Sequence, residues 1–246
     1  MTSTLSIATR FNGPPGSGNG GYVCGLLAHH AATPASRVMM VTLRRPPPLE
    51  QLLTVGQTSD GLVELRHGED LVADATAVVE DPPVVAIAAS SDVNAAEQAY
   101  RGATGHPFPT CFVCGTERAP GDGLCLRPGP VAGLTETTAC SWIPDESLVD
   151  PASGRVGSEF VWASLDCPGA WTLDLVGRPM VVGRMTARVD GVPRPGDRCV
   201  VMGQLLGREG RKAFTATTVY GSDGAVLGAA RSTWFTVDPR AFAVLQ

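Results

Sequence analysis

Two segments of the chain are predicted to be helices that are apolar on every side, and this feature restricts the possible folds more than any other. They are residues 20–28, with the sequence GGYVCGLLA, and residues 158–166, with the sequence SEFVWASLD. We expect one continuous helix in each half, near residues 21–30 and 159–176. A helix without a polar face has to be covered on all sides. In a chain of 246 residues, a sheet that curls around each helix is the cover we expect.

The segments that follow each helix repeat in the same order, which indicates two similar halves. Three pairs of segments correspond along the chain: 39–45 with 183–189, 55–57 with 202–204, and 68–77 with 224–232. The later segments alternate between apolar and polar residues, and Ser-Asp-Gly turns at 59–61 and 222–224 are typical of antiparallel hairpins. The sequence therefore predicts an α+β fold in which each half wraps an antiparallel sheet around a central helix.

A stretch rich in alanine, serine and other small residues connects the two halves. Asp81-Pro82-Pro83 ends a strand, and residues 93–100 are predicted to form one short helix within a crossover connection. We place the domain boundary near residue 105. Residues 1–105 then form the first domain and residues 106–246 the second.

Charge and composition exclude several classes of protein. The net charge is −5, and the scattered arginines and lysines leave no basic stripe for nucleic acid. No apolar run is long enough to span a membrane, and residues 1–13 lack the order of a signal peptide, so we expect a cytoplasmic protein. The seven cysteines are odd in number in a chain that needs no disulfides, so we expect them to be reduced.

One buried helix held by a curled antiparallel sheet, present twice, resembles the double hot-dog fold of acyl-CoA thioesterases. The resemblance rests on residues 20–23 (GGYV), on residues 111–115 (CFVCG) with Gly123-Leu124, and on residues 160–169 (FVWASLDCPG). It implies two hot-dog domains in tandem, an acyl-CoA or related thioester as partner, and no cofactor or metal ion. Open sheet edges further predict a homodimer.

Asp166 is the residue that we expect to carry the chemistry, because hot-dog thioesterases place their acidic residue at this helix position. Two helical turns place Glu159, Trp162 and Asp166 on one side of the helix. In those relatives the acid activates a water or attacks the thioester. The alternative is a structural carboxylate that accepts a local hydrogen bond or caps a kink at Pro168. Ala28 corresponds to Asp166 in the first half, so at most one catalytic centre is expected per chain.

The resemblance also implies backbone N–H donors for the thioester carbonyl oxygen at a helix N-terminus. Gly20 and Gly21 would supply them, although both also fit an ordinary turn before a helix. By chain order, Thr186 and Gln204 correspond to the catalytic hydroxyl and amide of long-chain acyl-CoA thioesterases, and both also fit ordinary strand positions. The other residues expected to contact the substrate are Tyr22, Glu159 and Trp162.

Two motifs suggest other sites. Residues 16–21 (GSGNGG) match the G-x-G-x-x-G pattern of dinucleotide sites, and Arg44-Arg45 could bind a 2′-phosphate. Against this, Pro14-Pro15 separates the preceding strand from the first glycine, and the rest of the chain lacks the alternation of strands and helices that a parallel sheet requires. One C-x-x-C knuckle with two further donors could hold zinc, or could pack as small apolar residues. The four residues are His106, Cys111, Cys114 and Cys125.

The second functional class that fits this sequence is a non-catalytic protein that binds an acyl or aromatic ligand in the same groove. The feature that separates the two classes is the direction of Asp166. A catalytic acid has to face a cleft that reaches the N-terminus of the first helix.

Overall fold

The computed structural model describes residues 2–33, 36–151 and 153–238. In this part of the chain, eleven strands form one antiparallel sheet in the order β1-β3-β4-β5-β2-β10-β13-β12-β11-β7-β6. They are β1 (Ser3–Leu5), β2 (Val38–Leu43), β3 (Leu53–Gln57), β4 (Val63–His67), β5 (Asp70–Val78), β6 (Gly129–Pro130), β7 (Thr137–Trp142), β10 (Met180–Val189), β11 (Cys199–Glu209), β12 (Lys212–Tyr220) and β13 (Val226–Thr236). A separate ladder joins β8 (Val149–Asp150) and β9 (Arg155–Val156).

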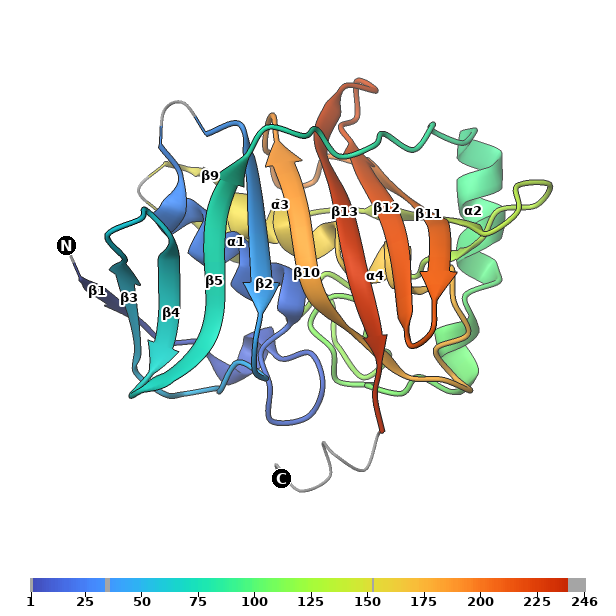
Figure 1. The fold of residues 1–246 in the computed structure, drawn as a ribbon. Helices are drawn as coiled ribbons and strands as arrows, with labels where there is room; N and C mark the ends of the chain where they lie inside the picture. Colours follow the sequence, from blue (N-terminus) through green and yellow to red (C-terminus); the bar gives the residue numbers. More distant parts are fainter. Residues whose placement is uncertain (1, 34–35, 152, 239–246) are drawn as a thin grey trace.

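The two halves of the sheet meet at β2 and β10 (Figure 1). These strands pair antiparallel, with Met40 opposite Thr186 and Thr42 opposite Arg184. Outward from this pair the first half continues through β5, β4 and β3, and the second half through β13, β12 and β11. The arrangement therefore occurs twice, as the repeat predicts. The boundary at residue 105 stays a prediction, and the proposed domains touch where the Phe112 N–H donates to the Asn12 carbonyl at 2.7 Å.

Two central helices lie against one face of the sheet (Figure 1). α1 (Gly20–Ala31) begins after Asn19, whose side chain caps it by accepting from the Tyr22 N–H at 2.9 Å. α3 (Ser158–Ser164) crosses α1 at Gly25, where an added Cβ would lie 2.7 Å from the Glu159 Cα. A sheet around central helices confirms the predicted α+β class. Short 3-10 helices are η1 (Thr9–Phe11), η2 (Arg101–Thr104) and η3 (Glu146–Leu148).

The second central helix, predicted as one piece, is broken. α3 ends at Ser164, and a second short helix, α4 (Cys167–Ala170), follows after Leu165 and Asp166. Pro168 explains the break, because it lacks an N–H and its ring would collide with the Ser164 carbonyl in a continuous helix. Asp166 takes φ −80° and ψ −83° between the two helices. The break places this carboxylate at a corner of the chain.

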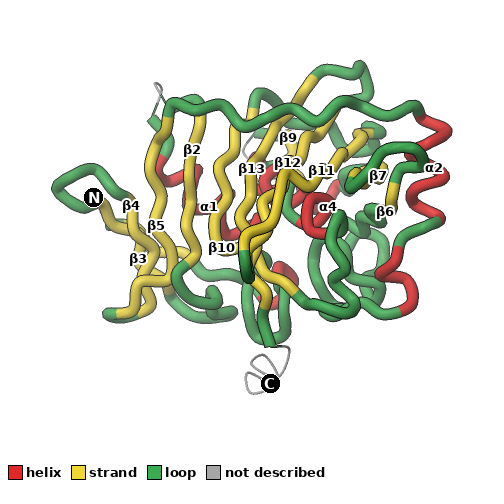
Figure 2. The backbone as a smooth tube through the Cα atoms, turned by 45° about the vertical axis from the view of Figure 1, so that its right-hand side comes forward, coloured by secondary structure: helices red, strands yellow, loops and turns green. Residues whose placement is uncertain are grey.

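The crossover connection runs over the opposite face of the sheet and ends in α2 (Ser90–Gln98) beside β6 and β7 (Figure 2). Val93 and Ala96 of this helix are buried in a separate apolar cluster. The Val85 carbonyl accepts a hydrogen bond from the Tyr220 hydroxyl at 2.6 Å, which fixes the connection to β12. The predicted crossover is observed, with its helix beginning three residues earlier than expected.

The predicted homodimer has no simple route through the sheet edges. In the described part of the chain the outermost strands are β1 and β6, with three and two residues. Edge strands this short limit pairing with another chain. A dimer would need another surface, and it stays a prediction. Light scattering at micromolar concentration is expected to give the dimer mass, and a monomer mass would contradict it.

Candidate active site

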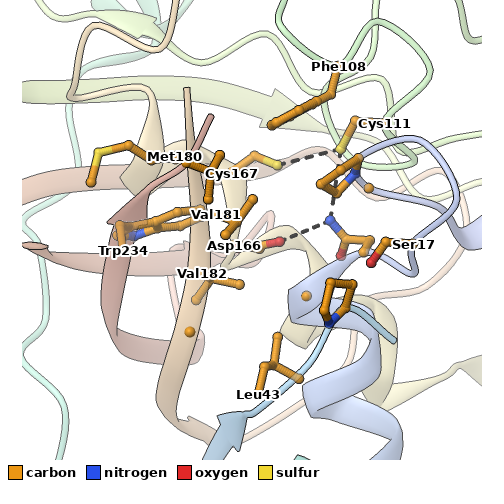
Figure 3. A pocket seen from close by; sticks show the side chains of 18 of the residues that line it. Ser17, Leu43, Phe108, Cys111, Asp166, Cys167, Met180, Val181, Val182 and Trp234 are labelled. Atoms are coloured by element: carbon orange, nitrogen blue, oxygen red, sulfur yellow. Dashed lines mark hydrogen bonds between the residues drawn. The ribbon is translucent and has the colours of Figure 1, made fainter. Parts of the chain in front are cut away.

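A mostly apolar cavity of about 350 Å³ lies where the N-terminus of α1, the start of α4 and the ends of β10 and β13 meet (Figure 3). Its volume falls in the range of small-molecule sites. Apolar side chains form much of its wall, and they are Leu43, Phe108, Leu175, Met180, Val181, Val182, Trp234, Phe235 and Val237. The polar and charged residues of the wall are Ser17, Asn19, Arg44, Arg45, His106 and Asp166.

Asp166 lines this cavity, and only one of its two carboxylate oxygens accepts hydrogen bonds from the described residues. Its Oδ2 accepts hydrogen bonds from the Asn19 Nδ2 at 2.9 Å and from the Gly21 N–H at 3.1 Å. Its Oδ1 is buried and accepts no hydrogen bond from the described residues. The side chain does not cap α4. The capping role considered from the sequence is therefore wrong. The hydrogen bond from Gly21 accounts for Oδ2 but gives no reason for burying Oδ1 without a partner.

Gly21 allows this close approach because it has no side chain. A Cβ at this position would lie 2.6 Å from the Asp166 Cβ and 2.8 Å from the Trp162 carbonyl oxygen. These distances are shorter than ordinary van der Waals contact. The sequence suggested that Gly21 contacts the substrate. In the structure, its lack of a side chain allows Asp166 to lie against the N-terminus of α1.

Burial raises the pKa of Asp166 to about 7, since desolvation disfavours the carboxylate. The hydrogen bonds from Gly21 and Asn19 act in the opposite direction and offset part of this effect. The N-terminus of α1 also carries partial positive charge. The ionised carboxylate of Asp166 is therefore costly to bury. Within the described residues, only the Asn19 Nδ2 and the Gly21 N–H donate hydrogen bonds to its Oδ2 and stabilise its charge.

The Gly20 N–H is an available donor on the cavity wall. The first N–H groups of a helix have no partner within the helix. The Tyr22 N–H donates to the Asn19 side chain, and the Gly21 N–H donates to Asp166. The Gly20 N–H has no hydrogen-bond partner in the described part of the chain. A Cβ at Gly20 would overlap Val182, so a side chain does not fit here. Gly20 lines the cavity, and its role as an oxyanion donor stays a prediction.

Asn19 is the functional residue that sequence reasoning missed. It is buried, its Oδ1 caps α1 and its Nδ2 holds Asp166, so one amide fixes both the helix start and the acid. The signal was present, because asparagine directly before an apolar helix is a preferred cap.

Replacing Asn19 separates its two roles. We expect Asn19→Ala to lower stability by about 1 kcal/mol through loss of the cap, and to lower turnover because Asp166 loses one partner. Asn19→Ser keeps a capping oxygen but cannot reach Asp166. It is expected to recover stability but not turnover, measured by thermal unfolding and kcat on the same samples. Equal recovery of both would contradict the assignment.

Thr186 and Gln204 are not brought to Asp166. Thr186 lies half-buried on β10 between Met185 and Ala187, which face the core, and therefore points to the opposite face. Gln204 is exposed on β11. Neither lines the cavity. Their predicted place beside the acid is corrected, and the amide that contacts Asp166 comes from Asn19.

The other predicted contact residues lie at the helix crossing. Glu159 and Trp162 face α1, as the helical spacing indicates, but they pack against Gly25 rather than line the cavity. Tyr22 is buried, and its ring stacks on Phe11 with centroids 4.2 Å apart. These side chains support the helix pair, and the structure does not place them on the cavity wall.

Three thiols meet beside Asp166. The sulfur atoms of Cys111, Cys114 and Cys167, here called the thiol cluster, lie within 4.8 Å of one another. Figure 3 shows two of them, Cys111 and Cys167. Hydrogen bonds from the other two thiols lower the pKa of Cys111. His106 Nε2 lies 3.2 Å from the Cys114 sulfur. Cys125, the fourth predicted donor, lies apart and bonds to backbone carbonyls, and Cys167 takes its place.

The dinucleotide alternative is wrong. Residues 16–21 form a loop and the start of α1 against an antiparallel sheet. A dinucleotide site of that type requires a parallel strand-helix-strand unit. Arg44 and Arg45 nevertheless line the cavity, each paired with an aspartate.

Within the described residues no helix is long and apolar enough to cross a membrane.

Solved structures resemble this chain over nearly its whole length. The tesB protein of Mycobacterium avium subs paratuberculosis aligns with TM-score 0.64 and 13% identity, covering 96% of this chain and 93% of its own. Acyl-CoA thioesterase II TesB2 of Mycobacterium marinum aligns with TM-score 0.59 and 13% identity, covering 98% and 94%. A conserved protein with hot dog fold from Alicyclobacillus acidocaldarius aligns with TM-score 0.59 and 10% identity, covering 97% and 94%.

These likenesses show that the chain has a hot-dog fold across both halves, which confirms the predicted architecture. No protein-family model matches the sequence. No curated protein matches it either. The fold is therefore shown by structural likeness, and a fold alone does not determine the activity.

Proposed function

We propose that this protein hydrolyses an acyl-CoA or a related acyl thioester in the cavity at Asp166. The observation that carries the proposal is Asp166, which lines an apolar cavity and whose buried Oδ1 has no hydrogen-bond partner in the described residues. A buried carboxylate oxygen is rarely left without a partner unless it is used. Two structures with similar folds are named as a tesB protein and an acyl-CoA thioesterase II, which supports this chemistry.

The reaction follows from the two groups at the N-terminus of α1. Asp166 removes a proton from a water molecule, and the water oxygen attacks the thioester carbonyl carbon. The Gly20 N–H donates to the carbonyl oxygen as it becomes negative, assisted by the helix dipole. The carbon–sulfur bond then breaks, and the thiol leaves with the proton that Asp166 returns. The products are a carboxylic acid and a thiol.

The cavity wall provides different surfaces for the two ends of such a substrate. Apolar side chains of β10 and β13, including Val182 and Trp234, suit an acyl chain or an aromatic acyl group. Arg44 and Arg45 belong to the same wall and are largely exposed. Phosphate groups of coenzyme A are the anionic part of the substrate that these guanidinium groups would bind.

Arg45→Ala is expected to raise KM for acyl-CoA about fivefold, since an exposed charged contact contributes about 1 kcal/mol. KM for the matching acyl-pantetheine, which lacks the nucleotide phosphates, is expected to stay unchanged. Arg66→Ala is the control, because Arg66 lies outside the cavity wall. Equal effects on both substrates would exclude Arg45 from phosphate binding.

A hydrolysis assay over acyl-CoA esters of different chain length, including aromatic acyl groups, tests the proposed function. Release of free coenzyme A, lost in Asp166→Asn, is the expected result. The non-catalytic binder remains the alternative, because the cavity holds Asp166 but neither Thr186 nor Gln204. Saturable binding of acyl-CoA without hydrolysis over the whole panel would overturn the enzymatic proposal in favour of the binder.

A further inference from the structure

The thiol cluster comes close to the spacing of a metal site, since its three sulfur atoms lie within 4.8 Å of one another. Cys111 and Cys114 form a C-x-x-C knuckle, and Cys167 comes from the start of α4, far along the chain. All three are buried and line the cavity wall. Zinc–sulfur bonds of about 2.3 Å in a tetrahedral site place two sulfur atoms about 3.8 Å apart. The Cys111 and Cys167 sulfur atoms already lie 3.8 Å apart.

Polar N–H donors surround the cluster, which distinguishes it from apolar packing of reduced thiols. The Trp171 Nε1 is buried without a hydrogen-bond partner in the described residues, and its indole lies beside the Cys114 thiol. The Asn19 Nδ2 lies 3.9 Å from the Cys111 sulfur. Such donors stabilise sulfur that carries negative charge, which is the form that binds metals. Neutral thiols packed as small apolar side chains give the Trp171 Nε1 no role, whereas the Asn19 Nδ2 also donates to Asp166.

We propose that Cys111, Cys114 and Cys167 bind one zinc ion through their thiolates. A cluster of three soft sulfur ligands that includes a C-x-x-C knuckle selects zinc over the harder divalent ions. Binding releases the three thiol protons to solvent. No sulfur changes its oxidation state. This inference is independent of the proposed hydrolysis, because it rests on residues other than Asp166.

His106 acts on this site as a donor to sulfur rather than as a ligand. The Phe108 N–H donates to His106 Nδ1 at 2.9 Å, so Nδ1 uses its lone pair there. Nε2 is then the nitrogen that carries the proton, and it lies 3.2 Å from the Cys114 sulfur. The fourth position of the zinc is therefore filled from the cavity by water. The histidine ligand suggested by the sequence is replaced by an N–H···S contact.

The ion would connect segments that no strand or helix joins. It ties the loop around residues 106–114 to the first residue of α4, and that residue follows Asp166 directly. Asn19, which holds Asp166, also contacts the Cys111 sulfur. We therefore expect zinc to be a positioning element for the corner at Asp166, and its removal to lower the melting temperature.

Metal analysis of the purified full-length chain tests the proposal. The protein is produced with zinc in the medium, under reducing conditions, with any histidine tag removed. About one tightly bound zinc ion per chain is expected. Replacement by cobalt is expected to give the intense absorption of a tetrahedral cobalt–thiolate centre. Less than about a tenth of an ion per chain, both as purified and after reconstitution with zinc, would overturn the proposal.

Matched cysteine variants assign the ligands. Cys114→Ser and Cys167→Ser are expected to lose the zinc, whereas Cys125→Ser, which removes the neighbouring thiol outside the cluster, is expected to retain it. His106→Gln is expected to weaken zinc affinity about 10–100-fold while a saturated sample still holds one ion per chain. Equal zinc content in all four variants would refute the assignment.

The wild-type measurements do not depend on whether a variant folds. Mass spectrometry of the untreated protein under the same reducing conditions adds a second readout. Three free thiols after zinc release are expected for the cluster. A Cys111–Cys167 disulfide instead of zinc would overturn the proposal, since the same sulfur pair would then be a redox pair. Zinc content is measured without substrate, so its outcome is separate from that of the hydrolysis assay.

Discussion

Asp166→Asn is expected to lower kcat for thioester hydrolysis by about 10²–10⁴-fold, with little change in KM. The asparagine oxygen can accept from the Gly21 N–H and from Asn19 as Oδ2 does, so the contacts that hold the side chain persist. The amide cannot take a proton from water. Stability is expected to change little, because the substitution also removes a charge that is costly to bury.

The control for this variant is Asp174→Asn, an exposed carboxylate on the segment after α4. It is expected to leave kcat unchanged. Melting temperature and kcat are measured on the same preparation, because an unfolded variant would lose activity for another reason. A folded Asp166→Asn protein with full turnover would remove Asp166 from the reaction. A large loss of stability with normal turnover would mean that its carboxylate is structural.

The fold was predictable because its signals are local and repeated. Helices without a polar face require cover, and hairpin turns between alternating segments indicate antiparallel strands. Both rules depend on short stretches of sequence, and the sheet around α1 and α3 follows them. The continuous second helix was wrong although the reason lay in the sequence. Pro168 prevents the helix from passing through Asp166.

The site was predictable only in part because its contacts join distant positions. Asp166 and Gly20 were selected from the helices that carry them, and both line the cavity, but the hydrogen bond from Asn19 spans 147 positions. Chain order selected Thr186 as a partner of the acid. Strand alternation would have argued against it, since the apolar neighbours Met185 and Ala187 occupy the core-facing positions. The role of Cys167 in the thiol cluster likewise needed the fold, because it lies 56 positions from Cys111.

Gly21→Ala is expected to lower both stability and turnover, because the new methyl group would enter the space between α1 and the corner at Asp166. The added Cβ would lie 2.6 Å from the Asp166 Cβ and 2.8 Å from the Trp162 carbonyl oxygen. Overpacking of this kind costs about 1–3 kcal/mol. In a chain of this size that lowers the melting temperature by about 2–12 °C. The better helix propensity of alanine offsets part of this, by about 1 kcal/mol at most.

Gly56→Ala is the matched control, since a Cβ on this β3 residue would meet no heavy atom within 4 Å. It is expected to leave melting temperature and kcat unchanged. The comparison separates two explanations for the glycine at position 21. If the residue were needed for substrate to approach the backbone, Gly21→Ala would keep its stability and raise KM. If it lets the acid approach the helix N-terminus, stability and kcat fall together, because the displaced carboxylate also loses its hydrogen bond from the Gly21 N–H.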